Sequence, residues 1–138
     1  MSNKFIEQVE SIVLSNLADE NFGANNLASL LGLSTSQALR KIKSNTGKSA
    51  TQYIRELRLK EAAKLIEKTD LTFAEISYKT GFGSPSYFNR MFLKQYGITP
   101  SDFKDKMNGF KTNLDGLFAE SKTLEKEIQK QLNGLKYE

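Results

Sequence analysis

The residue types in this chain restrict the chemistry that it can perform. Its 138 residues include no histidine and no cysteine, which removes the imidazole base, the thiol nucleophile and the usual zinc ligands. Carboxylates and lysines remain, but no clustered pair of acids indicates acid–base catalysis. We therefore predict that the chain is not an enzyme and that it requires no metal or cofactor.

A different chemistry is available between residues 76 and 100. Phe88 and Phe92 are four residues apart, so on a helix they share one buried face. Ser86, Asn89 and Arg90 fall mostly away from that face. An arginine can donate two hydrogen bonds to guanine and an asparagine can pair with adenine. The exposed face therefore carries residue types that read DNA bases.

The same stretch contains the signals that would build such a helix. Ser84 can cap it, because its hydroxyl accepts from an unpaired N–H of the first turn, and Pro85 suits the first helical position. Gly81 marks a turn that separates this helix from a shorter one before it. A short helix, a small turn and a second helix with an exposed polar face is the plan of a helix-turn-helix DNA reader.

The N-terminal part of the chain contains a similar arrangement. Residues 5–17 have apolar side chains at helical spacing, and residues 19–23 are expected to form a loop. Asn25 or Asn26 is expected to cap a second helix that Gly32 ends. Its inward residues are Leu27, Ala28, Leu30 and Leu31. Ser34 is expected to cap a third helix that Gly47 ends. This third helix has a buried seam of Ala38 and Ile42 and an outer face of Thr35, Ser36, Leu39, Arg40 and Lys43.

A longer helix is predicted over residues 49–68, with Ser49 at its start. Its inner stripe consists of Tyr53, Ile54, Leu57, Ala62, Leu65 and Ile66, and its polar side carries Arg55, Arg58, Lys60, Lys64 and Lys68. A fifth helix is expected at residues 73–79 after a Thr72 cap, and a last short helix at residues 101–106. No segment alternates with the two-residue period of a strand, so we predict an all-α domain.

The second half of the chain repeats the first. Gly32 corresponds to Gly81 at an offset of 49, and Arg40 corresponds to Arg90 at an offset of 50, so the second turn holds one extra residue. Further matching pairs are Leu27/Ile76, Leu33/Phe82, Ala38/Phe88, Ile42/Phe92, Gly47/Gly97, Ser49/Thr99 and Tyr53/Phe103. Two such units could occupy successive major grooves about 34 Å apart, and the helix of roughly 18 residues between them would span about 27 Å.

Residues 5–104 resemble the DNA-binding domain of AraC/XylS-type transcriptional regulators. The resemblance is carried by Leu27-Ala28, Gly32, Ser34, Arg40, Gly47-Lys48-Ser49, Tyr53-Ile54, Arg58-Leu59, Glu75-Ile76, Gly81-Phe82, Ser86-Tyr87-Phe88, Arg90, Phe92 and Gly97-Ile98-Thr99-Pro100. Departures at Ile42, Ser77 and Phe103-Lys104 remove no reading position. The resemblance implies two helix-turn-helix units joined by a long helix, with seven helices in all, that bind tandem major grooves of promoter DNA.

Position by position, the resemblance points to candidates for base contacts on the two reading helices. These are Thr35, Ser36, Leu39, Arg40, Pro85, Ser86, Asn89 and Arg90. Candidates for phosphate contacts are Lys43, Lys48, Ser49, Lys94 and Thr99, of which Ser49 and Thr99 begin helices whose backbone N–H groups can face a phosphate. Alternatives stay open: the arginines could contact phosphate or solvent, the lysines could be solvated, and the serines could act only as helix caps.

The predicted division places a tandem helix-turn-helix domain at residues 1–106 and a C-terminal helical extension at 107–138. Within the domain, the first unit covers about 5–48, the bridging helix about 49–68 and the second unit about 72–104. From residue 117 onward, apolar residues recur at near-heptad spacing. Three interpretations stay open for this tail: a helix packed back on the domain, a helix for self-association or a partner, or a disordered end.

The function predicted from these features is sequence-specific binding of double-stranded DNA in transcription regulation. Residues 1–104 hold 14 basic and 10 acidic residues, so the whole net charge of +4 lies there. The N-terminus lacks a signal-peptide pattern and no apolar run approaches membrane length, so we expect a cytoplasmic protein without a membrane partner. The alternative is a protein-interaction module that docks RNA polymerase or, through residues 117–135, a second copy. The target sequence and the regulating signal stay open, as does membership of a longer chain.

Overall fold

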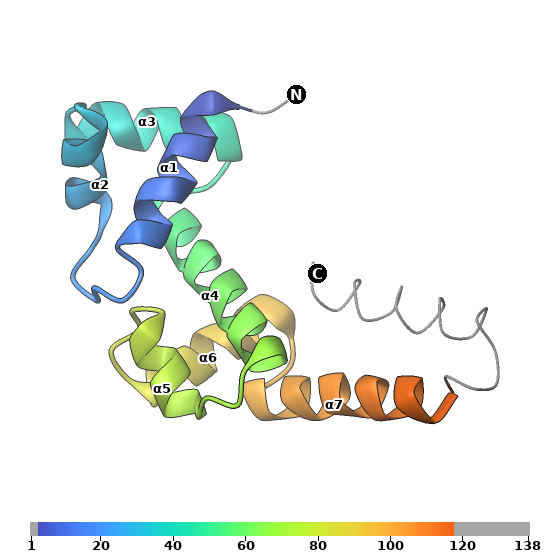
Figure 1. Ribbon diagram of the computed structural model, residues 1–138. Coiled ribbons are helices and arrows are strands. Elements are labelled where there is room, and N and C mark those ends of the chain that lie inside the picture. Colours follow the sequence, from blue (N-terminus) through green and yellow to red (C-terminus); the bar gives the residue numbers. More distant parts are fainter. Residues whose placement is uncertain (1–2, 118–138) are drawn as a thin grey trace.

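The computed structural model describes residues 3–117, and this part of the chain forms seven α-helices and no strand (Figure 1). The helices are α1 (Lys4–Ser15), α2 (Ala24–Leu31), α3 (Thr35–Thr46), α4 (Ala50–Lys68), α5 (Phe73–Lys79), α6 (Pro85–Tyr96) and α7 (Pro100–Leu117). The first unit contains α1 to α3, the second contains α5, α6 and the start of α7, and α4 runs between them. The predicted all-α fold with two helix-turn-helix units on a long helix is confirmed.

Helix starts follow local side-chain signals. Four predicted caps accept a hydrogen bond from the backbone N–H three residues later, namely Ser34, Ser49, Thr72 and Ser84. The prediction for α2 was wrong, because Gly23 is its N-cap. Asn26 lies inside the helix and accepts from the Gly23 N–H at 3.0 Å. An asparagine in the first turn can therefore satisfy the helix start by reaching back to it.

The helix α4 contributes to two separate hydrophobic cores. Its N-terminal half packs in the first core through Tyr53, Ile54 and Leu57, beside residues of α1, α2 and α3. Its C-terminal half packs in the second core, whose buried members are Leu59, Ala62, Ala63, Ile66, Ile76, Phe82, Phe88, Phe92, Phe103 and Met107. Each unit alone is too small to bury much apolar surface, so both depend on this shared helix.

Arg58 was predicted on the polar side of α4, and this prediction was wrong. The side chain is only 5% exposed and lies between Leu57 of the first core and Leu59 of the second. Its position is four residues from both Ile54 and Ala62, which are buried. This spacing puts Arg58 on the buried face of α4, whereas its charge indicated an exposed position.

The backbone repeats itself in the two units. Gly32 and Gly81 both have positive φ, at 72° and 80°, and both turns lead to a capping serine. One residue, Leu33, separates Gly32 from Ser34, whereas two residues separate Gly81 from Ser84. The extra residue predicted in the second turn therefore lies between Gly81 and Ser84, where the chain uses a second glycine of positive φ, Gly83 at 77°.

Two further expectations differ from the structure. Leu30 is 58% exposed rather than inward, because the helices beside α2 cover Leu27 and Ala28 instead. The last helix does not stop at residue 106 but continues to Leu117, and Met107 is 1% exposed in the second core. The packing of Met107 outweighs the weak helix preference of Asn108 and Gly109. The division at residue 106 stays a prediction, and residues 118–138 lie outside the described part.

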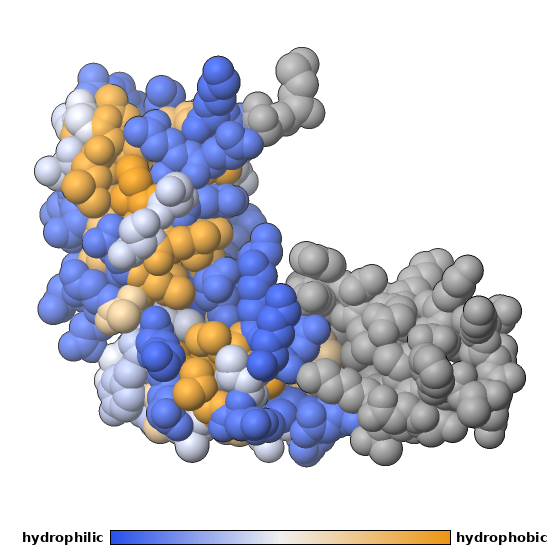
Figure 2. Space-filling view, viewed as in Figure 1, coloured by the Kyte–Doolittle hydropathy of each residue, from blue (hydrophilic) through white to orange (hydrophobic). Residues whose placement is uncertain are grey.

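The surface is mixed in character. On the face shown in Figure 2, hydrophobic residues gather over both units, with hydrophilic residues around them. Leu14, at 43% exposure, and Leu30 are exposed leucines of the first unit. Among residues 3–117 no helix combines the length and the apolar character that a membrane crossing requires.

Truncation of Phe92 is expected to destabilise the second unit strongly. This side chain is fully buried and contacts three other aromatic rings, with centroids 5.7, 4.8 and 5.5 Å away. Phe92→Ala should lower the free energy of unfolding by about 3–5 kcal/mol, measured by urea denaturation. The neighbouring Leu93→Ala is the control, because Leu93 is 46% exposed. Equal losses for the two variants would contradict the assignment of Phe92 to the core.

Candidate nucleic-acid interface

The first recognition helix, α3, presents its predicted residues at its N-terminal end. Thr35, Ser36, Leu39 and Arg40 are all exposed, whereas Ala38 and Ile42 of the same helix are buried. The Thr35 hydroxyl donates a hydrogen bond to Asn25 Oδ1 of α2 at 3.0 Å. Leu39 is an apolar side chain with 39% exposure, which suits contact with a thymine methyl group.

The second recognition helix, α6, presents the equivalent positions. Ser86, Asn89 and Arg90 are exposed, and Pro85 at the helix start is half-buried. The guanidinium of Arg90 lies over the ring of Tyr87, 5.7 Å from its centroid. This cation–π contact restrains a long side chain and so favours a defined direction for its hydrogen bonds.

Aromatic packing holds α6 in place beneath this exposed face. The ring of Phe88 lies 5.4 Å from that of Phe82 in the preceding turn, and the ring of Phe92 lies 5.5 Å from that of Phe103 in α7. At the end of α6, burial raises the pKa of Tyr96 to about 12, with the charge of Glu56 acting in the same direction. The Tyr96 phenol is therefore neutral at physiological pH and serves the core.

A groove beside α6 joins predicted and unpredicted residues. It has a volume of about 370 Å³ and is lined by Phe73, Asn89, Arg90, Leu93, Thr99 and Ser101. Three of these were predicted as DNA contacts, whereas Phe73, Leu93 and Ser101 were not. The spacing could have revealed Leu93, which lies one helical turn beyond Asn89 on the same face. Its exposure of 46% gives this edge of the groove an apolar surface.

The predicted phosphate contacts differ in their surroundings. Ser49 caps α4, and the Thr99 hydroxyl accepts from the Asp102 N–H in the first turn of α7, so both lie at helix N-termini that favour anions. Lys94 is exposed near the end of α6, and Lys43 Nζ donates to the carbonyl of residue 47 at 3.2 Å. Lys48 forms an ion pair with Glu56, which a phosphate would have to displace.

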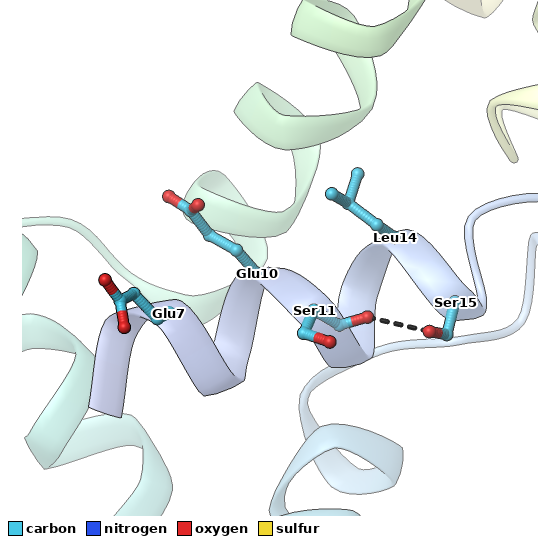
Figure 3. Close-up of a pocket in the computed structure, with 5 residues that line it drawn as sticks. All are labelled: Glu7, Glu10, Ser11, Leu14 and Ser15. Atoms are coloured by element: carbon cyan, nitrogen blue, oxygen red, sulfur yellow. Dashed lines mark hydrogen bonds between the residues drawn. The ribbon is translucent and has the colours of Figure 1, made fainter. Parts of the chain in front are cut away.

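A second groove lies on the outer surface of α1 (Figure 3). It is lined by Glu7, Glu10, Ser11, Leu14 and Ser15, and it contains none of the predicted contacts. Glu10 also accepts a hydrogen bond from the Tyr53 hydroxyl at 3.0 Å. Two carboxylates repel a phosphate backbone, so this surface is not part of the interface that we assign.

Two exposed recognition helices on a common scaffold define a tandem helix-turn-helix DNA-binding domain. The family model described as a helix-turn-helix domain matches residues 27–106. This model is of the AraC type, so the chain belongs to the AraC family of transcriptional regulators, as the resemblance implied.

Similar proteins include both relatives and solved structures. The chain is 34% identical over 106 residues to histidine kinase P4 of Formosa agariphila, and 30% identical over 103 residues to the Msm operon regulatory protein of Streptococcus mutans. These matches cover 77% and 75% of this chain but only 8% and 37% of the relatives, which are much longer. The structure also resembles the DNA-binding domain of AdpA, solved in complex with a target DNA, with 25% identity, a TM-score of 0.69 and coverage of 75% of this chain and 92% of that one.

Removal of either exposed arginine is expected to relax sequence recognition in one half of the bound DNA. Arg40→Ala and Arg90→Ala should each weaken binding by about 1–3 kcal/mol, because a bidentate contact to guanine would be lost. Binding to a panel of single-base variants of the site would locate the relaxed position. Lys60→Ala, which changes an exposed residue of α4, is the control. If affinity falls equally for all sequences, the arginine instead contacts a phosphate.

The lysines near the ends of the recognition helices are expected to act through charge alone. Lys43→Ala and Lys94→Ala should each reduce the slope of log affinity against log salt concentration by about 0.9, because one phosphate contact is lost. Sequence preference should not change. Lys79→Ala on α5 serves as the matched exposed lysine. An unchanged slope in either variant would show that the lysine is only solvated.

Proposed function

We propose that this chain binds double-stranded DNA sequence-specifically, with α3 and α6 in two successive major grooves, and thereby regulates transcription. The observation that carries the proposal is the duplicated unit, in which equivalent helices are exposed at both ends of one bridging helix. With 19 residues, α4 spans about 28 Å, close to the repeat of about 34 Å between grooves on one face of DNA. A single chain could then read an asymmetric site, without the twofold symmetry of a dimer.

Each of the two units would contact a different half of the DNA site. Four side chains on α3 and four on α6 are the proposed base contacts, at the positions named above. Ser49 and Thr99 follow the two recognition helices at equivalent positions, so each unit would be oriented by a phosphate at a helix N-terminus. Base contacts then specify the sequence and phosphate contacts set the register.

The role in transcription is supported by the relatives, two of which are named an operon regulatory protein and an activator, RhaS. We propose that the chain itself performs no catalysis, since its histidine- and cysteine-free composition suits a binding domain. The relatives named here come from bacteria, in which chromosomal DNA lies in the cytoplasm, and we propose that location for this chain. Contact with RNA polymerase and self-association through residues 117–135 stay predictions, and from 118 onward those residues lie outside the described part.

Selection from random double-stranded sequence is the direct test of this function. The enriched sites should contain two different conserved elements about 10 base pairs apart, bound by one chain. Scrambling either element should weaken binding, and scrambling both should leave only salt-dependent, non-specific affinity. The mass of the complex, measured by light scattering, gives the number of chains per site. Enrichment of no sequence would contradict the proposal, and a palindrome bound by two chains would contradict its single-chain form.

A further inference from the structure

The two units meet at a junction built around one side chain, Arg58. Its Nη1 donates to the carbonyl oxygens of Leu17 and Thr80, the latter at 2.9 Å. Its Nη2 donates to the carbonyl oxygens of Asp19 and Phe22, at 3.0 and 3.2 Å. Leu17, Asp19 and Phe22 belong to the loop between α1 and α2, whereas Thr80 belongs to the turn between α5 and α6. The guanidinium therefore joins the first unit to the second, from the helix that both share.

Only an arginine can make this set of contacts. Each Nη atom carries two hydrogens, so four carbonyl acceptors satisfy all four of them in one planar fork. A lysine has three donors on a single nitrogen, so it cannot donate four hydrogen bonds from two separate nitrogen positions. The junction thus depends on the shape of the guanidinium as well as on its charge.

The backbone of the second turn approaches this junction closely. A Cβ atom on Gly81 would overlap Arg58 Nη1 and the carbonyl oxygen of Leu17, and one on Gly83 would overlap the carboxylate of Glu20. Gly32, the counterpart of Gly81 in the first unit, has open space around its Cβ position. Gly83, in the part of the turn that carries the extra residue, also faces the first unit. The second turn therefore differs from the first where it touches the other unit.

The junction is linked to both recognition helices through short intervening segments. Phe22 is buried in the first core together with Leu27 and Ile42, and Ile42 belongs to α3. On the other side, the turn holding Thr80 and Gly81 ends at Ser84, the cap of α6. A displacement at Arg58 would thus be transmitted to α6 relative to α3 through short, packed segments.

We propose that Arg58 is a positioning residue that sets the separation and angle of α3 and α6, so that the chain selects DNA by the spacing between its two half-sites. This inference rests on the proposed binding to two grooves. One inserted base pair rotates a half-site by about 35° and moves it by about 3.4 Å. A rigid protein cannot engage both half-sites after such a change and loses the gain from simultaneous binding, whereas a loosened protein keeps part of it.

The test measures the affinity of the full chain for duplexes in which zero to four base pairs are inserted between the selected half-sites. The unaltered chain should bind the natural spacing about 100-fold more tightly than a single half-site, and one or two inserted base pairs should remove most of that gain. Arg58→Lys should reduce the gain about tenfold at the natural spacing and flatten the dependence on spacing to within about threefold. Its affinity for each single half-site should stay unchanged. Arg55→Lys, on the same helix, is the control.

Gly81→Ala disturbs the same junction from the opposite side, so only one of the two variants needs to fold. Gly32→Ala is its matched control, because it carries the same unfavourable positive φ without the overlap. Gly81→Ala should flatten the spacing dependence, and Gly32→Ala should keep it. If Arg58→Lys and Gly81→Ala fold and keep the spacing preference, the proposed role of Arg58 is overturned but the proposed DNA binding is not. A wild-type chain that binds two half-sites no more tightly than one would overturn the proposed function as well.

A second measurement does not depend on any junction variant. Because the chain has no cysteine, Ser44→Cys on α3 and Gln95→Cys on α6 introduce a single pair of spin-label sites at exposed positions. The distance distribution between the labels should be narrow without DNA and keep its maximum when DNA binds. It should broaden with Arg58→Lys, while thermal unfolding shows that the helices persist. A broad distribution in the labelled chain with Arg58 intact would overturn the inference.

Discussion

The arrangement of this molecule depends on a buried arginine that bonds to carbonyl oxygens of two helix-turn-helix units. Burial of a charge is unfavourable unless polar partners replace water, and the four acceptors supply that replacement. Burial lowers the pKa of Arg58, and the charge of Asp19 partly opposes this effect. The guanidinium of an arginine nevertheless stays protonated in a protein. Loss of the side chain would leave several carbonyl groups without a donor, so the contact is costly to break even though its net contribution is modest.

The bridging helix explains why such a contact is needed. Because one core lies at each end of α4, this helix stabilises each unit separately. The orientation of one unit relative to the other then depends on the contacts that join them at the middle of α4. In the chain, Arg58 lies between Leu57 of the first core and Leu59 of the second. The two cores stay separate, and the hydrogen bonds of Arg58 link the two units. Hydrogen bonds are directional, whereas apolar contact is not, so this solution defines an angle better than continuous packing would.

The recognition surfaces are organised by the opposite principle. Asn89 and Arg90 lie on a helix whose reverse side is held by Phe88 and Phe92, so a rigid apolar base presents polar side chains to solvent. Both faces follow from helical periodicity, which is why the exposure of the predicted residues could be inferred from spacing. The place of Phe73 and Ser101 in the groove could not be inferred in this way, because they come from α5 and α7 and only packing brings them beside α6.

Local chemistry in the sequence determined four of the helix caps, the glycine turns, the duplication and the exposed faces of the recognition helices, since each depends on residues within a few positions. Tertiary structure decided the features that depend on distant neighbours. Leu30 looks as apolar as Leu27 but lies uncovered, and Met107 extends α7 past the expected end by packing in a core. Arg58 is the clearest case, because its acceptors lie 22 to 41 residues away. Side-chain type predicted a solvated charge, and only the fold places carbonyl groups around it.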